Sequence, residues 1–188
     1  MAQGDLDPAF TQIRRTTKAV TDQEWIKGFL HKAPVGVIAT VLKDQPFLST
    51  KLYVYDDERH CIYFHAATEG RMLDNLRLNP KVCFTAYKMG RLKPAPRARS
   101  FGVEYESVVV FGKMQIVTDT QENIEILQKF MEKYAAQFHP GRDYSEIEET
   151  ELDDVAVFRL DVEGWSGKHD QTAESFPGAY RYEDIVSG

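Results

Sequence analysis

Hydrophobic residues along the chain fall mainly into short runs separated by polar turns, a pattern typical of β-strands. Six runs are of this kind, at 35–42, 46–57, 61–65, 81–87, 105–118 and 155–165. Only a few polar residues separate the first three runs, which predicts a three-stranded antiparallel meander. In the last run Phe158 and Leu160 alternate with Arg159 and Asp161, as expected for a strand with one buried face.

Helical periodicity is confined to the segments between these runs. Thr21 opens a capping box that predicts a helix ending before Pro34, and a short helix is expected to begin near Thr68 and to end before Pro80. A longer amphipathic helix is expected over 120–137. Its apolar face would consist of Ile124, Leu127, Phe130, Met131 and Tyr134.

Six strands with helices only at the crossings predict a mainly β protein with peripheral helices. Closing such a sheet removes exposed strand edges, so we expect a closed or nearly closed antiparallel barrel. The 188 residues suffice for one domain with a hydrophobic core. The ends, 1–12 and 170–188, are rich in small and polar residues and are expected to be loose or to reach over a partner.

Composition and charge exclude several classes of protein. No run approaches the roughly 18 apolar residues of a membrane span, and the first residues lack a signal-peptide core, so we expect a cytoplasmic protein without membrane contact. A net charge of −6 argues against nucleic-acid binding. Cys61 and Cys83 lie in apolar runs and are expected to be free thiols.

Several motifs with known chemistry are missing. The chain has no G-x-S-x-G, G-x-x-x-x-G-K-[ST], G-x-G-x-x-G, H-E-x-x-H or C-x-x-C sequence, which argues against serine hydrolases, P-loop NTPases, Rossmann dehydrogenases and zinc sites. The five histidines are scattered, and none has metal-ligand spacing to another histidine or a cysteine. We therefore expect no metal site.

The segment 63–80 is the strongest candidate for chemistry. A strand that ends near His65 turns into a helix whose first amides are free, and Gly70 permits close approach of a ligand. Arg71 lies in the first turn, where the helix dipole disfavours a cation, so an external anion such as phosphate accounts for it. An ordinary surface arginine is the alternative, because the unfavourable dipole energy is below roughly 1 kcal/mol.

Four segments together give the sequence a family resemblance: APVGVIAT, YFHAATEGRMLDNLRLNPKVCF, YESVVVFGK and WSGKH. In this order and spacing, over residues 13–169, they resemble the pyridoxamine 5'-phosphate oxidase-related flavoproteins, most closely the 5-nitroimidazole resistance (NimA-like) branch. The resemblance implies a six-stranded split β-barrel that forms a homodimer and holds FMN at the subunit interface.

The resemblance also implies which residues contact the flavin. Those expected to line the ring and the ribityl chain in one subunit are Ser49, Thr50, Lys51, Leu52, His65 and Ala66. Arg71 would bind the phosphate. The opposite subunit would contribute Ser107, Trp165 and Lys168.

Two departures from the family pattern stand out. Met72 occupies a position where the family often has a second basic residue, which removes one expected phosphate partner. Lys51 or the basic run 88–99 could compensate for it. The end of the chain lacks the arginine and histidine pattern of true pyridoxamine phosphate oxidases, which argues against vitamin B6 oxidation.

His65 is the candidate catalytic residue. Its imidazole could donate a proton to a reduced substrate, hydrogen-bond the flavin or coordinate a haem iron, and its alternative role is that of a barrel-rim residue bonded to a carbonyl. We therefore expect an FMN-dependent reductase of nitroaromatic or quinone-like small molecules. The alternative is a flavin- or haem-binding module without turnover.

Overall fold

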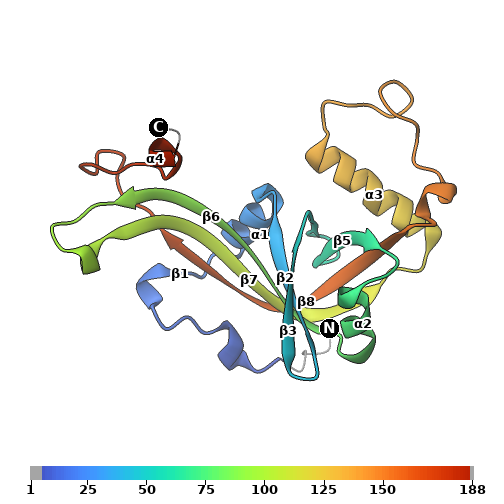
Figure 1. Cartoon of the computed structure of the whole chain (residues 1–188), viewed down its shortest axis with the longest axis horizontal. Helices are drawn as coiled ribbons and strands as arrows, with labels where there is room; N and C mark the ends of the chain where they lie inside the picture. Colours follow the sequence, from blue (N-terminus) through green and yellow to red (C-terminus); the bar gives the residue numbers. More distant parts are fainter. Residues whose placement is uncertain (1–5, 187–188) are drawn as a thin grey trace.

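The computed structural model describes residues 6–186 and consists of one antiparallel sheet with helices around it (Figure 1). Along its main path the strand order is β3-β2-β6-β7-β8-β5-β4, and β1 pairs with β8 off this path. The strands are β1 Ala19–Val20, β2 Gly36–Leu42, β3 Gln45–Lys51, β4 Val54–Asp56, β5 Cys61–Ala67, β6 Lys81–Lys93, β7 Gly102–Ile116 and β8 Val155–Asp170. The two end strands, β3 and β4, follow each other in the chain, so the sheet curls into a barrel that stays open between them.

The mainly β fold and the split barrel are confirmed, but the prediction of six strands was wrong, because the sheet has eight. The run 46–57 forms two strands separated by Leu52 and Tyr53. The backbone N–H of Tyr53 donates to the Tyr134 hydroxyl at 3.0 Å, and its carbonyl accepts from that hydroxyl at 2.8 Å. These side-chain bonds replace strand pairing, so the predicted meander breaks and β5 pairs with β4 and β8.

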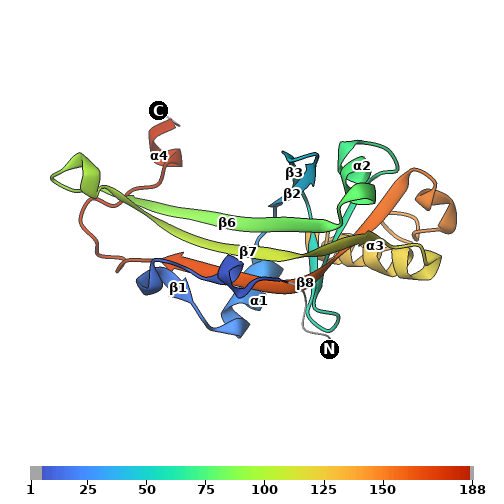
Figure 2. The ribbon, with the colours of Figure 1, turned by 90° about the horizontal axis from the view of Figure 1, so that it is seen from below.

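Strands β6, β7 and β8 continue beyond the barrel as a long ribbon (Figure 2). The β6–β7 hairpin at its end carries most of the basic run 88–99. There Arg91 donates to both carboxylate oxygens of the buried Glu104, at 2.9 and 2.7 Å, and the Thr172 hydroxyl donates to the same carboxylate at 2.6 Å. These bonds hold the segment after β8 against the hairpin.

Within residues 6–186 the α-helices are α1 Gln23–Lys32, α2 Arg71–Leu78, α3 Thr120–Tyr134 and α4 Glu183–Val186. Two predicted helix starts were wrong. At α1 the carboxylate of Asp22, rather than Thr21, accepts from the amides of Glu24 and Trp25, because aspartate caps as well as threonine and lies one residue closer. At α2 the N-cap is Gly70, and no side chain caps the helix.

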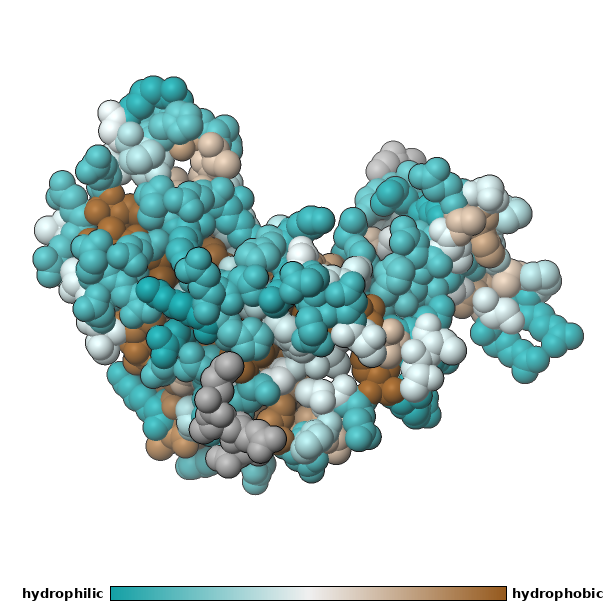
Figure 3. All heavy atoms as spheres, turned by 180° about the vertical axis from the view of Figure 1, so that it is seen from behind, coloured by the Kyte–Doolittle hydropathy of each residue, from teal (hydrophilic) through white to brown (hydrophobic). Residues whose placement is uncertain are grey.

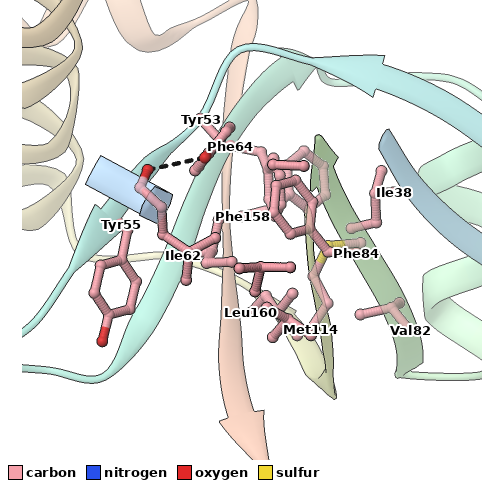
Figure 4. Close-up of a cluster of buried hydrophobic side chains, with 14 of the residues drawn as sticks. Ile38, Tyr53, Tyr55, Ile62, Phe64, Val82, Phe84, Met114, Phe158 and Leu160 are labelled. Atoms are coloured by element: carbon pink, nitrogen blue, oxygen red, sulfur yellow. Dashed lines mark hydrogen bonds between the residues drawn. The ribbon is translucent and has the colours of Figure 1, made fainter. Parts of the chain in front are cut away.

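The main core fills the barrel between α1, α2 and the sheet (Figure 4). A second, smaller cluster lies between β5 and α3, where Ile126 and Phe130 are buried and Leu127 and Tyr134 pack beside them. The predicted apolar stripe of α3 was therefore only partly right. Ile126 was missing from it, whereas Ile124 is only half-buried and lines a cleft beside residues 140–147.

From behind, hydrophilic side chains cover most of the molecule and apolar side chains form separate patches (Figure 3). Among the described residues, no helix has the length and apolar character that crossing a membrane requires. The cysteines Cys61 and Cys83 are free thiols, the first buried and the second half-buried.

Candidate functional site

Side chains from three elements lie on or beside β3, an end strand of the main sheet path. Strand β3 contributes Phe47 and Lys51, His65 lies two residues before the end of β5, and Arg71 is the first residue of α2. The Arg71 guanidinium carbon lies 5.4 Å from the centroid of the Phe47 ring, so the start of α2 is positioned over β3. Because β3 is an end strand of the main sheet path, one side of its backbone stays free beside this cluster.

His65 is held by packing. Its ring lies edge-on to Phe130 of α3 with a centroid distance of 4.7 Å, and within 6–186 its side chain makes no hydrogen bond. Burial lowers the pKa of His65, and the positive charge of Lys51 lowers it further. The imidazole is therefore neutral at pH 7, with both ring nitrogens available to a ligand.

The turn before α2 provides an accessible backbone. Gly70 has a φ of +131°, which only glycine adopts readily, and a Cβ built on it would meet nothing within 4 Å. Thr68, expected to cap the helix, is exposed and does not cap it, so the first amides of α2 have no side-chain partner. Arg71 is exposed beside these amides. This combination of free donors and one cation fits a phosphate.

Met72 belongs to the core and not to this site. Its side chain is buried among core residues, with 7 % of its surface exposed. A basic residue at this position would therefore have to leave the core to reach a ligand. Arg71 is therefore the one cation at the start of α2. Among the other predicted site residues on and beside β3, Lys51 also carries a positive charge.

Alternation along β3 divides the residues expected to line the flavin between two faces of the sheet. Ser49 pairs with Ile38, a core residue, so Ser49 and Lys51 lie on the inner face. Thr50 pairs with Val37 and lies on the outer face, as does Leu52 just beyond the strand, which is 46 % exposed. A molecule lying along this edge would touch side chains of both faces.

The outer face continues across the sheet to Ser107 and Lys168. One row of cross-strand partners crosses the sheet from β2 to β8 through Val37, Thr85, Val109 and Ser166. A parallel row lies two residues farther along the strands and consists of Tyr87, Ser107 and Lys168. Cross-strand partners share a face, so Thr50, Ser107 and Lys168 all project from the outer face. Strands β2 and β6 lie between Thr50 on β3 and Ser107 on β7.

Trp165 lies on the other face of β8. It pairs with Val110, a core residue, and its Nε1–H donates to the Gln23 side chain at 2.6 Å. Its ring meets His60 edge-on at 4.6 Å. The structure thus separates Trp165 from Ser107 and Lys168, and it fixes the indole against α1 of the same chain. Ala66 pairs with Ala156 and packs against the main core.

Three residues near these sites were not predicted from the sequence. Phe47 and Phe130 position Arg71 and His65, and Tyr87 is 68 % exposed on the outer face. The amphipathic stripe of the helix 120–137 included Phe130, but only the fold brings it to His65. In the part of the chain that the structure describes, no three His, Cys, Asp or Glu side chains form a metal-binding group.

Comparisons with known proteins identify the fold. A family model described as "Pyridoxamine 5'-phosphate oxidase" matches residues 22–169. The flavocytochrome Anf3 from Azotobacter vinelandii has a TM-score of 0.74 at 20 % identity, covering 95 % of this chain and 79 % of that one. A FAD- and haem-binding protein from Mycobacterium smegmatis has a TM-score of 0.70 at 18 % identity, covering 91 % and 80 %.

A third structure is named for 5-nitroimidazole antibiotic resistance and comes from Bacteroides thetaiotaomicron. Its TM-score is 0.65 at 21 % identity, and the match covers 80 % of this chain and 85 % of that one. At these identities the similarity to solved structures concerns the fold. A search of curated proteins finds no match to the chain.

Proposed function

The chain belongs to the pyridoxamine 5'-phosphate oxidase family, and from this premise we propose that it is a cytoplasmic, homodimeric, FMN-dependent reductase of small nitroaromatic or quinone-like molecules. The observation that carries the proposal is that Arg71 lies over β3 at Phe47, and that Lys51 of the same strand lies close enough to His65 to lower its pKa. Two cations, the free amides of α2 and a neutral imidazole therefore border β3, which pairs along the main sheet path on one side only. This set suits a planar molecule with a phosphate tail.

A second copy of the chain would complete the site. Thr50 and Leu52 lie at the β3 edge of the outer face, and Ser107 and Lys168 lie on β7 and β8. Strands β2 and β6 separate the two groups by about 14 Å at the usual strand spacing, and two copies packed about a two-fold axis would bring them together. We therefore place the flavin between two subunits.

The outer face has the character of such an interface. Its exposed apolar side chains include Leu48 at 64 %, Tyr87 at 68 % and Met89 at 44 % exposure. Soluble proteins rarely leave contiguous apolar surface uncovered. Burying these side chains against a second copy would stabilise the dimer by removing apolar area from water.

In this proposal each of the residues on and beside β3 has a separate role. Arg71 and the first amides of α2 bind the phosphate, and Lys51 adds positive charge. A bound flavin supplies two-electron transfer. His65 holds a proton on its imidazole for the substrate, and Phe130 keeps the ring edge-on and shielded on one side.

The substrate class is proposed from the names of solved structures that share the fold. One similar structure is named for 5-nitroimidazole resistance, and others are named for flavin and haem. Nitro and quinone groups accept two electrons, so they suit a flavin reductase. The family membership and the residues on and beside β3 support flavin binding. The nitroaromatic substrate is a more specific proposal.

Haem binding without turnover is a second candidate, favoured by one observation. The His65 ring makes no hydrogen bond within the described residues, and a neutral imidazole would be able to hold a haem iron. In that case His65 would coordinate the iron, and the module would store or sense a cofactor.

The visible spectrum of the purified protein tests these alternatives. A yellow protein with flavin absorption that is bleached by NAD(P)H and regained with a nitroaromatic compound supports the reductase. A red protein whose haem absorption disappears in the His65→Ala variant supports haem binding. A colourless protein that takes up neither FMN nor haem on titration contradicts both.

A further inference from the structure

We propose that a cavity under the N-terminal segment binds a planar aromatic molecule with carbonyl or nitro oxygens, and that this molecule is the substrate. The cavity lies between residues 6–10 and the outer face of β2, β6 and β7 and has a volume of about 370 Å³. Small-molecule sites typically span about 300–1,000 Å³, so this one suits a compound of one or two rings. Its role in reduction rests on the proposed function.

The floor of the cavity is an apolar row across three strands. Ala39 pairs with Cys83, and Cys83 pairs with Phe111, so all three project from the outer face. Phe10 forms the wall, with its ring 5.7 Å from that of Phe111 and tilted by 49°. Aromatic and aliphatic surfaces on two sides favour a flat, uncharged ring.

The N-terminal segment is seated on the sheet by close contact. A Cβ built on Gly164 would come within 2.6 Å of Leu6 Cδ2 and 3.1 Å of Thr11 Cγ2, so the segment lies in close contact with β8. Asp7 caps the short 3₁₀ helix Pro8–Thr11 by accepting from the Ala9 amide. The wall of the cavity is therefore held in place by packing on β8 and by its own cap.

Charge at the rim favours ligand oxygens. Glu163 pairs with Lys113 at 3.2 Å, and Asp7 is used by its own turn, so both acidic groups of the rim have partners. Lys81 is exposed at the same rim, and within the described residues its ammonium has no hydrogen bond or ion pair. A carbonyl or nitro oxygen would find a cation there.

The cavity is next to the proposed flavin site. Ala39 is two residues from Val37, the partner of Thr50, which places the two rows about 7 Å apart at the rise of a β-strand. A ring in the cavity would therefore lie one row from the residues expected to line the flavin. Reduction requires reacting atoms about 3–3.5 Å apart, so a bound ring would extend from the cavity toward the flavin row.

Calorimetric titration of the full chain, free of flavin, with 1,4-naphthoquinone tests the inference. Ala39→Phe fills the floor and is expected to raise the Kd at least about tenfold, and Phe10→Ala, on an exposed side chain, about three- to tenfold. Ile116→Ala, on the same strand β7 but outside the cavity, is the matched control and is expected to leave the Kd unchanged. FMN affinity should change less than about twofold in all three variants.

Other outcomes would overturn either the binding of the quinone in the cavity or the proposed function. Quinone binding that is equal in the wild type and in Ala39→Phe, or that is absent from the wild type, overturns the inference. Binding that is lost as the protein is concentrated shows that a second copy fills the cavity, and overturns it as well. Wild-type protein that binds the quinone but no FMN leaves the cavity as a binding site and contradicts the proposed function instead.

Discussion

At the scale of single residues, the most informative feature is the neutral state of His65. Burial against Phe130 and the nearby Lys51 both disfavour the imidazolium, so the pKa of His65 falls below its ordinary value of 6.5. The lowered pKa of His65 also makes the stability of the fold depend on pH. The folded chain binds fewer protons than the unfolded chain, so this stabilising contribution is present above about pH 6.5 and is lost as the pH falls through the lowered pKa.

Replacing Lys51 by methionine should raise the pKa of His65, because the variant removes a positive charge that disfavours the imidazolium. The ring C–H chemical shifts of His65, followed by NMR against pH, measure this directly. Lys43→Met, in the turn between β2 and β3, is the control and should leave the titration in place. A midpoint that does not move in Lys51→Met would show that the two side chains are not coupled.

If His65 donates its proton as an imidazolium, turnover should fall as the pH rises through the lowered pKa. The pH profile of kcat in the wild type and in His65→Gln checks this. The variant should lose that limb of the profile while its FMN affinity changes little. Equal losses of affinity and turnover at every pH would contradict a role as proton donor.

Arg71→Ala should weaken FMN binding by about 1.5–3 kcal/mol, because it removes a charge-assisted hydrogen bond to the phosphate. Fluorescence titration with FMN gives the affinity. Riboflavin, which has no phosphate, should bind the wild type and the variant equally. Arg77→Ala, at the other end of α2, is the matched control. Unchanged FMN affinity in Arg71→Ala removes the residue from the site.

At the scale of elements, the last turn of α3 holds the open side of the barrel. The Lys133 ammonium donates to the carbonyls of Ala33 and Tyr53 at 3.1 and 3.0 Å, and the Tyr134 hydroxyl bonds both backbone groups of Tyr53. These bonds connect the segment before β2 with the junction between β3 and β4. Phe130, one turn earlier, packs on His65, so α3 positions both sides of the candidate site.

Tyr134→Phe should lower the free energy of unfolding by about 1–2 kcal/mol, because the half-buried amide of Tyr53 loses its acceptor. Urea denaturation followed by circular dichroism measures the change. Glu132→Gln, an exposed neighbour on α3, serves as the control and should stay within about 0.5 kcal/mol of the wild type. A Tyr134→Phe variant as stable as the wild type would mean that the junction does not need this bond.

The sequence predicted elements well where local pattern decides them. The apolar runs of β2, β5, β6, β7 and β8 and the three longer helices were found because alternation and helical periodicity are local signals. The break between β3 and β4 was missed because Tyr53 is bonded by Tyr134, 81 residues away. The two-residue strand β1 has no pattern of its own and exists through its pairing with β8.

The candidate site was predicted in part for the same reason. Gly70 and Arg71 could be identified from their unusual places at a helix start, and the structure leaves both accessible. The core position of Met72 could not be read without the fold, because a helix as short as α2 does not reveal which face is buried. The family resemblance could not show that Trp165 faces away from Ser107 either.

At the scale of the whole molecule, the proposed dimer would form through the outer face of the sheet. Tyr87 lies in the same row as Ser107 and Lys168 and is 68 % exposed. Tyr87→Asp would place a charge in the proposed interface and should convert the dimer to a monomer, as measured by analytical ultracentrifugation at micromolar concentrations. Tyr182→Asp, an exposed tyrosine near the C-terminal helix, is the control and should leave the dimer intact.

The central claim is that one flavin is held by groups from two chains, and hybrid dimers test it most directly. Arg71→Ala removes the phosphate partner of its own chain, whereas Lys168→Ala removes a contact to the flavin of the other chain. Mixing the two variants therefore creates dimers with one intact site. Titration with FMN should show wild-type affinity at up to half of the sites in these hybrids and at none in either parent. Hybrids that bind as weakly as the parents, or a wild type that binds no FMN, would contradict the account.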